Sequence, residues 1–233
     1  MWPPDEQRFA DRATAGRELA ADVAAYLARL PLADDVRPVV LALPRGGVPV
    51  GYEIAKTIKA DFDVLISRKI GLPWQPEFSV GAIAEDGPPV FDRDALSTAG
   101  LSSTDLGPAV QRERVELRRR QEYYRGERPP PPIHDRVVVI VDDGLATGIT
   151  SRAAVRAVRA ADPAHVVFAA PVCAAEAVDW LGDEADQVLC VHSPREFHAL
   201  GLWYRDFPQL TDDDVTGMLT RAWGATRSAI VLP

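Results

Sequence analysis

The sequence is poor in cysteine, with only Cys173 and Cys190 among its 233 residues. Neither belongs to a Cys-x-x-Cys pair or a Cys/His cluster, so the pattern favours neither a disulfide framework nor a thiolate metal site. The sequence also lacks an apolar run of the roughly 18 residues that suggest a membrane span. Residues 1–5 have neither the basic nor the apolar region of a signal peptide. We therefore expect a cytoplasmic protein with no membrane partner.

Positive charge is also scarce. Lys and Arg number 26 against 34 Asp and Glu, which gives a net charge of −8. This balance argues against a nucleic-acid partner that requires broad neutralisation of phosphates. A polyanionic ligand would need a local group of cations or a bound metal ion. The length and the hydrophobic content of 47% allow a sizeable core, and we expect a single domain over residues 1–233.

The most informative stretch is residues 136–161. Its apolar run, residues 137–141, is typical of a parallel strand that is covered on both faces. Small apolar residues recur at helical spacing from Ala153 onwards. Two carboxylates, Asp142 and Asp143, and a glycine-bracketed turn lie between these segments. The sequence therefore predicts a strand, a loop and a helix.

The loop, residues 144–150, has the composition of an anion site. Amide N–H groups and the positive end of the helix dipole should converge there, beside the hydroxyls of Thr147 and Thr150. The preceding carboxylates would repel an anion, but they can accept hydrogen bonds from sugar hydroxyls or hold a divalent cation. Together the two halves predict a sugar-phosphate site. The alternative is an ordinary strand-turn-helix with a capping Asp, although a buried strand rarely ends in two unpartnered carboxylates.

The motif Asp142-Asp143-Gly-x-x-Thr-Gly-x-Thr resembles the phosphoribosyl pyrophosphate (PRPP) signature of the type I phosphoribosyltransferases. The whole chain is most similar to the bacterial group of predicted phosphoribosyltransferases. The resemblance implies that Asp142 and Asp143 contact the ribose hydroxyls and hold Mg²⁺, directly or through water. It also implies a cradle for the 5′-phosphate formed by Ala146, Thr147, Gly148, Ile149 and Thr150.

A second glycine loop, Arg45-Gly46-Gly47, follows the apolar run 39–43 and precedes a helical pattern. A cation and two glycines at a helix start can bind an anion, although a Gly-Gly pair alone is more typical of a tight turn. The resemblance implies that this loop binds the diphosphate of PRPP. Arg45 is then a candidate catalytic residue.

A third cluster, Arg68-Lys69, ends the apolar run 62–67 and enters a loop. Without other information, two such cations would be solvated charges. The resemblance implies that they face the diphosphate. Lys69 is the first candidate for stabilising the leaving group, and Arg68 is the second.

Residues 71–92 correspond broadly to the flexible hairpin lid that the resemblance implies. Within them, Glu85 and Asp86 are more typical of a hairpin turn than of catalytic acids. Residues 93–132 form an elaboration that contains a charged helix, residues 104–125, and four consecutive prolines. We interpret the triple arginine of this helix as a solvated face, and the elaboration suggests a homodimer contact.

Strands at residues 164–172 and 187–191 alternate with helical segments. This order predicts an α/β fold with a mainly parallel, Rossmann-like sheet and helices on both faces. Ligands of such sheets bind at the carboxyl ends of the strands, where all three clusters fall. The helix expected at residues 13–30 receives no chemical role.

Residues 192–210 are rich in aromatics, and the resemblance implies a small hood that binds the acceptor. Trp203 or Tyr204 could stack on a planar ring, and Asp206 could accept a hydrogen bond from it. The alternative, that these aromatics close the core after the last strand, stays equally open.

The expected reaction is transfer of 5-phosphoribosyl from PRPP to a nitrogen nucleophile, with Mg²⁺ and release of pyrophosphate. Ala146 stands where enzymes for 6-oxopurines typically carry an Asp, so adenine, a pyrimidine or a non-nucleobase amine is favoured. One rival is a non-catalytic PRPP- or nucleotide-binding regulatory protein. A phosphatase using Asp142 is less favoured, because a haloacid-type site would need Asp-x-Asp.

Overall fold

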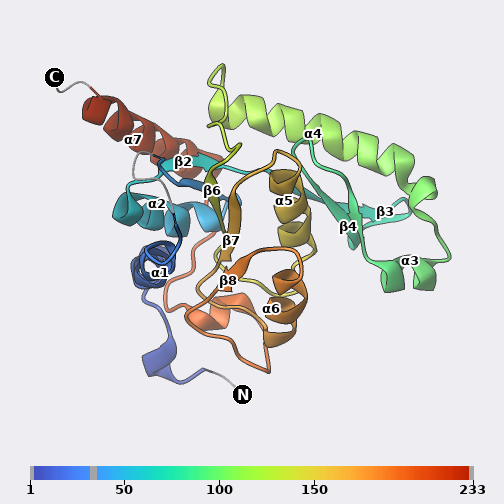
Figure 1. The fold of residues 1–233 in the computed structure, drawn as a ribbon. Helices are drawn as coiled ribbons and strands as arrows, with labels where there is room; N and C mark the ends of the chain where they lie inside the picture. Colours follow the sequence, from blue (N-terminus) through green and yellow to red (C-terminus); the bar gives the residue numbers. More distant parts are fainter. Residues whose placement is uncertain (1–2, 32–35, 231–233) are drawn as a thin grey trace.

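A five-stranded parallel sheet forms the centre of the protein (Figure 1). The computed structural model describes residues 3–31 and 36–230, so part of the signal-peptide prediction falls outside the described residues. The strand order is β2-β1-β6-β7-β8, and each neighbouring pair is parallel. The strands are β1 (Val39–Ala42), β2 (Asp61–Val64), β6 (Val137–Val141), β7 (His165–Ala169) and β8 (Gln187–Leu189). The predicted parallel sheet is therefore confirmed.

Helices cover both faces of this sheet, as the alternating pattern predicts (Figure 1). Because successive side chains of a strand point to opposite faces, Val139 of β6 packs into one core cluster and Ile140 into another. The first cluster receives side chains from α1 (Arg12–Leu27), α2 (Gly47–Ile58) and α7 (Asp212–Ile230). The second receives side chains from α5 (Ile149–Arg159) and α6 (Ala175–Gly182). Within the described ranges, no helix has the length and apolar character needed to cross a membrane.

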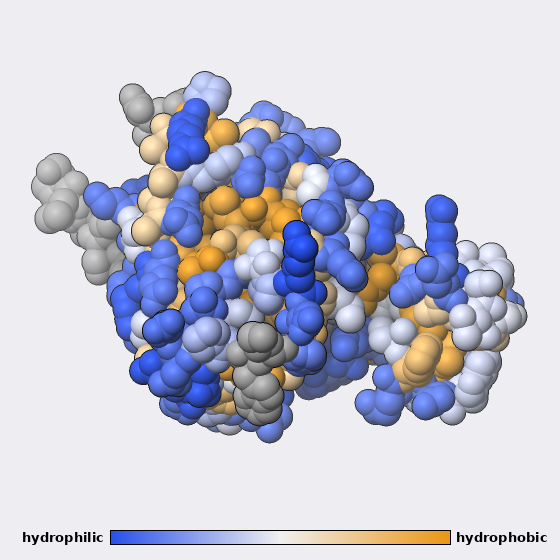
Figure 2. Space-filling view, turned by 90° about the horizontal axis from the view of Figure 1, so that it is seen from below, coloured by the Kyte–Doolittle hydropathy of each residue, from blue (hydrophilic) through white to orange (hydrophobic). Residues whose placement is uncertain are grey.

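A second, antiparallel sheet projects from one side of the body, together with the short helix α3 (Arg93–Ala99) (Figures 1 and 2). Its strands are β3 (Ser67–Leu72), β4 (Gln75–Ala84) and β5 (Val90–Phe91). The prediction that Arg68 and Lys69 leave a strand and enter a loop is wrong, since both lie within β3. The physical reason is a period of two, in which buried Ile70 and Leu72 alternate with outward-facing residues.

The elaboration forms a long helix, α4 (Gly107–Arg125), after a 3-10 turn at Ser103–Leu106. Leu117 and Tyr124 are buried against the body, whereas Arg118 and Arg119 are exposed as predicted. The prediction of a solvated face is wrong for Arg120, which is partly buried and lines a cavity because it follows Leu117 by three residues on the same side of the helix. The last residue of α4 behaves differently, because Arg125 is buried and its Nε donates to Asp63 Oδ2 at 3.0 Å.

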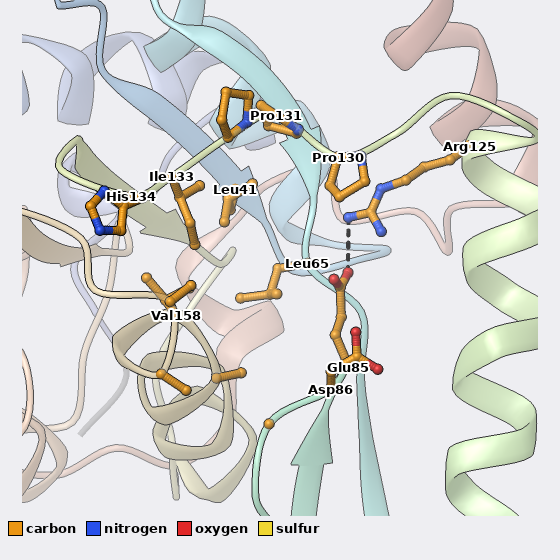
Figure 3. Close-up of a pocket in the computed structure, with 15 residues that line it drawn as sticks. Leu41, Leu65, Glu85, Asp86, Arg125, Pro130, Pro131, Ile133, His134 and Val158 are labelled. Atoms are coloured by element: carbon orange, nitrogen blue, oxygen red, sulfur yellow. Dashed lines mark hydrogen bonds and ion pairs between the residues drawn. The ribbon is translucent and has the colours of Figure 1, made fainter.

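A second ion pair joins Arg125 to the turn after β4, where its Nη2 lies 2.8 Å from Glu85 Oε1 (Figure 3). Beside this pair lies a cavity of about 560 Å³ lined by the proline segment 130–132 and by α5. Glu85 also accepts from the backbone N–H of Ile66 at 3.1 Å. Its role in the turn is therefore structural, consistent with the interpretation of Glu85 as a turn residue.

Candidate active site

The two glycine loops predicted as ligand sites, residues 45–47 and 144–150, follow β1 and β6, which end side by side. Ala42 pairs with Val141 in the parallel register, so the loops that follow the two strands must lie against each other. The approach is close, because a Cβ added to Gly46 would lie only 2.0 Å from Asp143 Oδ2. The peptide bond between Pro44 and Arg45 is cis. Glycine at position 46 is thus required for the two loops to share one site.

The two adjacent aspartates have different surroundings. Asp142 is partly exposed and lines two cavities, and its Oδ1 accepts from the N–H of Asp143 at 2.8 Å. Crowding by protein atoms, together with the charge on Asp143, raises the pKa of Asp142 well above its usual range. Asp143 is only 8% exposed and is bound on two sides, by Arg12 and by the hydroxyl of Tyr204. Asp142 therefore offers the more accessible carboxylate.

Arg12, in the first turn of α1, is a site residue that the sequence interpretation missed. Its Nε donates to Asp143 Oδ2 at 2.8 Å, and its Nη1 donates to the carbonyl of Pro208 at 2.9 Å. The guanidinium carbon lies 3.7 Å from the centre of the Phe207 ring. The signal was available in the spacing, because Arg12 shares the i, i+3, i+4, i+7 face of Ala15, Gly16 and Leu19. An arginine on the buried face of an amphipathic helix predicts a buried carboxylate partner.

We expect Arg12→Gln to lower the free energy of unfolding by about 3 kcal/mol, because Asp143 would keep a nearly buried charge without its cation. Chemical denaturation of Arg12→Gln, Asp143→Asn and the double variant would measure this coupling. The double variant should regain most of the loss, since both charges are then removed together. Strictly additive losses would mean that the ion pair does not contribute to stability.

The loop before α5 has the predicted form. Gly148 has a φ of 66°, a value that favours glycine, and it is the N-cap of α5, which begins at Ile149. The loop is anchored through Leu145, whose N–H donates to the carbonyl of Val172 at 2.8 Å. Thr147 and Thr150 line different cavities on the two sides of the loop. Thr150, in the first turn of α5, therefore shares a cavity with Asp142, whereas Thr147 does not.

One cavity gathers five of the predicted site residues, including all the predicted cations. It has a volume of about 690 Å³ and lies between the β1 loop, β3 and α4, and we call it the α4 cavity. Arg68 in its wall donates from Nε to Glu113 Oε2 of α4 at 2.8 Å, and Arg45 Nη1 lies 3.9 Å from Asp212 Oδ1. The predicted site residues that line it are Arg45, Arg68, Lys69, Asp142 and Thr150.

A smaller cavity, of about 550 Å³, lies under the predicted hood, and we call it the hood cavity. Residues Leu200 and Phe207 to Leu210 line one side of it, and Arg12, Asp142 and Asp143 line another. The segment predicted as a hood therefore does border the site.

The prediction that Trp203 or Tyr204 stacks on the acceptor is wrong, and the alternative, that these aromatics close the core, holds. Trp203 and Tyr204 are 7% and 1% exposed, within a small core cluster that also contains Phe9. Trp203 stacks on His192 at 5.3 Å between ring centroids, and the Tyr204 hydroxyl donates to the carbonyl of Asp143 at 2.6 Å. Neither ring is available to stack on an acceptor. Asp206 is exposed but does not line the hood cavity.

Asp142 and Asp143 are the residues predicted to hold Mg²⁺, and their surroundings differ in what they leave for a metal ion. Within the described ranges, no group of three or more His, Cys, Asp or Glu side chains could hold a metal. Asp142 faces both cavities, whereas one carboxylate oxygen of Asp143 is taken by Arg12. Mg²⁺ is commonly held by one or two carboxylates together with substrate phosphates and water. Asp142 is therefore the residue that would hold it.

Comparison with known proteins agrees with this geometry. A family model described as phosphoribosyl transferase domain matches residues 10–198. Two proteins from strains of Mycobacterium tuberculosis, each named "Putative phosphoribosyl transferase", are 42% identical over 214 residues, which are 92% of this chain and 47% of theirs. The chain thus spans about half the length of these curated relatives.

Two solved structures share the fold of this chain. A crystal structure of a Thermus thermophilus protein has a TM-score of 0.76 at 40% identity, covering 92% of this chain and 98% of the other. An Aquifex aeolicus protein, with a TM-score of 0.51 and 13% identity over 82% of this chain and 78% of the other, shares the fold. The architecture is that of the type I phosphoribosyltransferases. The chain belongs to the phosphoribosyl transferase family.

Proposed function

We propose that this protein transfers the 5-phosphoribosyl group of PRPP to a nitrogen nucleophile and releases pyrophosphate. The observation that supports the proposal most is the α4 cavity, where Thr150 of the α5 start, a partly exposed carboxylate and several cations line one space. Each part matches one part of PRPP, namely the 5′-phosphate, the ribose hydroxyls and the diphosphate. Substrate of this kind would lie across the carboxyl ends of β1 and β6.

The residues then have separate roles. The amides at the start of α5 and the hydroxyl of Thr150 bind the 5′-phosphate. Asp142 accepts hydrogen bonds from the ribose hydroxyls and orients C1 towards the acceptor. As the bond from C1 to the diphosphate oxygen breaks, Arg45 and Lys69 stabilise the negative charge that collects on the leaving group. Bound Mg²⁺ would neutralise part of the same charge.

The hood cavity is the place we propose for the acceptor. It shares Asp142 with the α4 cavity, and its other walls include Arg12 and the segment Pro208 to Leu210. The Phe207 ring is covered by the Arg12 guanidinium and by Tyr204, so an acceptor would be bound by polar groups and not by stacking on that ring. Ala146 is exposed and carries no carboxylate that could exchange a proton with a 6-oxopurine. Adenine, a pyrimidine or a non-nucleobase amine is therefore the acceptor class that we propose.

A pyrophosphate-release screen would test the proposal. The protein would be incubated with PRPP and Mg²⁺ against adenine, pyrimidine bases and non-nucleobase amines, with hypoxanthine and guanine as contrasting acceptors. We expect release with one member of the first group and none with the 6-oxopurines. If the whole panel is silent while calorimetry shows tight PRPP binding, the protein is a PRPP-binding regulatory protein and not a transferase.

A further inference from the structure

The inserted helix α4 forms one wall of the α4 cavity. Ala109, Arg112, Glu113 and Arg120 all line this cavity. They share one face of the helix, because their spacing of three, four and eleven residues returns to the same side. Arg118, between them in sequence, is exposed and does not line the cavity. The side chains that α4 presents to the site therefore include two arginines.

Positive charge is concentrated in this cavity, although the chain as a whole has a net charge of −8. Among the residues that the structure describes, Glu77, Glu113 and Asp142 are the ones that contribute carboxylates to its lining. The cations that line it are Arg45, Arg68, Lys69, Arg112 and Arg120. A cavity with more cations than carboxylates favours a ligand that carries several negative charges.

The cations differ in how they are neutralised. Arg68 is paired with Glu113 at 2.8 Å, and Arg120 is paired with Glu116 at 3.1 Å. Within the part of the chain that the structure describes, Lys69 and Arg112 form no ion pair. Lys69 lies on β3 and Arg112 on α4, so positive charge without an ion-pair partner lies on two walls of the α4 cavity. An anion between these walls could be contacted from both.

We infer that α4 is part of the substrate site, and that Arg112 and Arg120 bind the diphosphate end of the ligand. Thr150, at the start of α5, and Asp142 line the same cavity, so an anion held by α4 would share that space with a ligand bound at these two residues. That arrangement selects a ligand in which a diphosphate is attached to a sugar phosphate. The inference rests on the proposed function for the identity of the ligand, and the insertion then has a binding role in addition to any structural one.

Calorimetry with inorganic pyrophosphate, PRPP and ribose 5-phosphate, each with excess Mg²⁺, would test the inference. We expect Arg112→Gln and Arg120→Gln each to weaken pyrophosphate and PRPP by about tenfold, the lower range for a lost charge-assisted hydrogen bond. Ribose 5-phosphate should change by less than about twofold. Arg118→Gln, on the solvent side of the same helix, is the matched control and should leave all three affinities within about twofold.

The possible outcomes separate this inference from the transferase proposal. Pyrophosphate binding that depends on Arg112 and Arg120 supports the α4 subsite even if the acceptor screen is silent. Unchanged pyrophosphate and PRPP affinities in both variants would overturn it, even if transfer is observed. Equal weakening of ribose 5-phosphate would also overturn it, since the arginines would then not act on the diphosphate end. Thermal unfolding of each variant would confirm that the fold is retained.

Discussion

The Asp142→Asn variant should bind PRPP at least about 100-fold more weakly than the unchanged protein. The substitution keeps the size of the side chain but removes the charge that we propose accepts from the ribose hydroxyls and holds Mg²⁺. Calorimetry with excess Mg²⁺ would measure the loss. Asp206→Asn, an exposed position in the hood that does not line the hood cavity, is the control and should bind normally. Unchanged binding by Asp142→Asn would remove the proposed ribose site.

The same Asp142→Asn substitution should not lower the stability of the folded protein, although it weakens PRPP binding. Crowding by protein atoms and the charge on Asp143 raise the pKa of the partly exposed Asp142, so keeping Asp142 ionised costs the folded protein free energy at neutral pH. Asparagine removes that cost. We therefore expect the melting temperature of Asp142→Asn to be equal to or above that of the unchanged protein. A lost affinity accompanied by a lower melting temperature would instead indicate damage to the fold.

The largest loss of stability is expected from Arg125→Met. Its guanidinium is the cation for Asp63, which is fully buried, and for Glu85. Removing it strands buried negative charge and should cost about 3–5 kcal/mol, or roughly 10 °C in melting temperature for a chain of this length. Denaturant unfolding would measure the change. Arg118→Met, on the exposed side of the same helix, should stay within about 0.5 kcal/mol.

The pH dependence of this variant has a definite sign. Burial raises the pKa of Asp63, and Arg125 partly opposes that rise. Because the folded-state pKa lies above the unfolded one, the stability associated with Asp63 falls as pH rises from the ordinary aspartate range through the raised pKa. Without Arg125 the pKa should rise further. The deficit of Arg125→Met should therefore be smaller at about pH 5 than at about pH 8, and a larger deficit at low pH would contradict the burial of this charge.

Local sequence patterns were enough to predict the framework of the site. Residues 137–141 form the predicted buried strand, and α5 begins at Ile149, within the loop predicted over residues 144–150 and close to its expected end. Both features depend on neighbours within a few residues, namely a run of β-branched side chains and a helix start. The alternation of strands and helices along the chain was likewise sufficient to predict the parallel sheet.

The features that were missed depend on distant partners. Arg12 and Asp143 lie 131 residues apart in sequence, and Arg125 and Asp63 lie 62 apart, so no local window contains either pair. The same holds for Tyr204, whose hydroxyl donates a hydrogen bond to the backbone carbonyl of Asp143, 61 residues earlier in the sequence. An aromatic residue in a polar segment does not by itself distinguish a ligand contact from a core position.

Several expectations stay predictions from the sequence. These are the homodimer, the cytoplasmic location, the need for Mg²⁺ and the movement of the hairpin over a bound substrate. The hairpin does carry two large apolar side chains in solvent, Trp74 at 63% and Phe78 at 46% exposure. Trp74 immediately precedes β4, and Phe78 lies on it. Contact with a substrate would require the hairpin to move, and contact with a second chain would require association.

The first residues of the chain are joined to the hood by backbone pairing. The N–H of Phe9 donates to the carbonyl of Trp203, and the N–H of Arg205 donates back to Phe9, each at 2.9 Å. Arg12 extends the same connection to Pro208 and Asp143. The hood cavity, where we propose that the acceptor binds, is thus lined in part by two chain segments that do not line the α4 cavity. If the proposed function is correct, changes in these two segments would alter which nitrogen nucleophile related proteins accept, while the residues that bind PRPP stay the same.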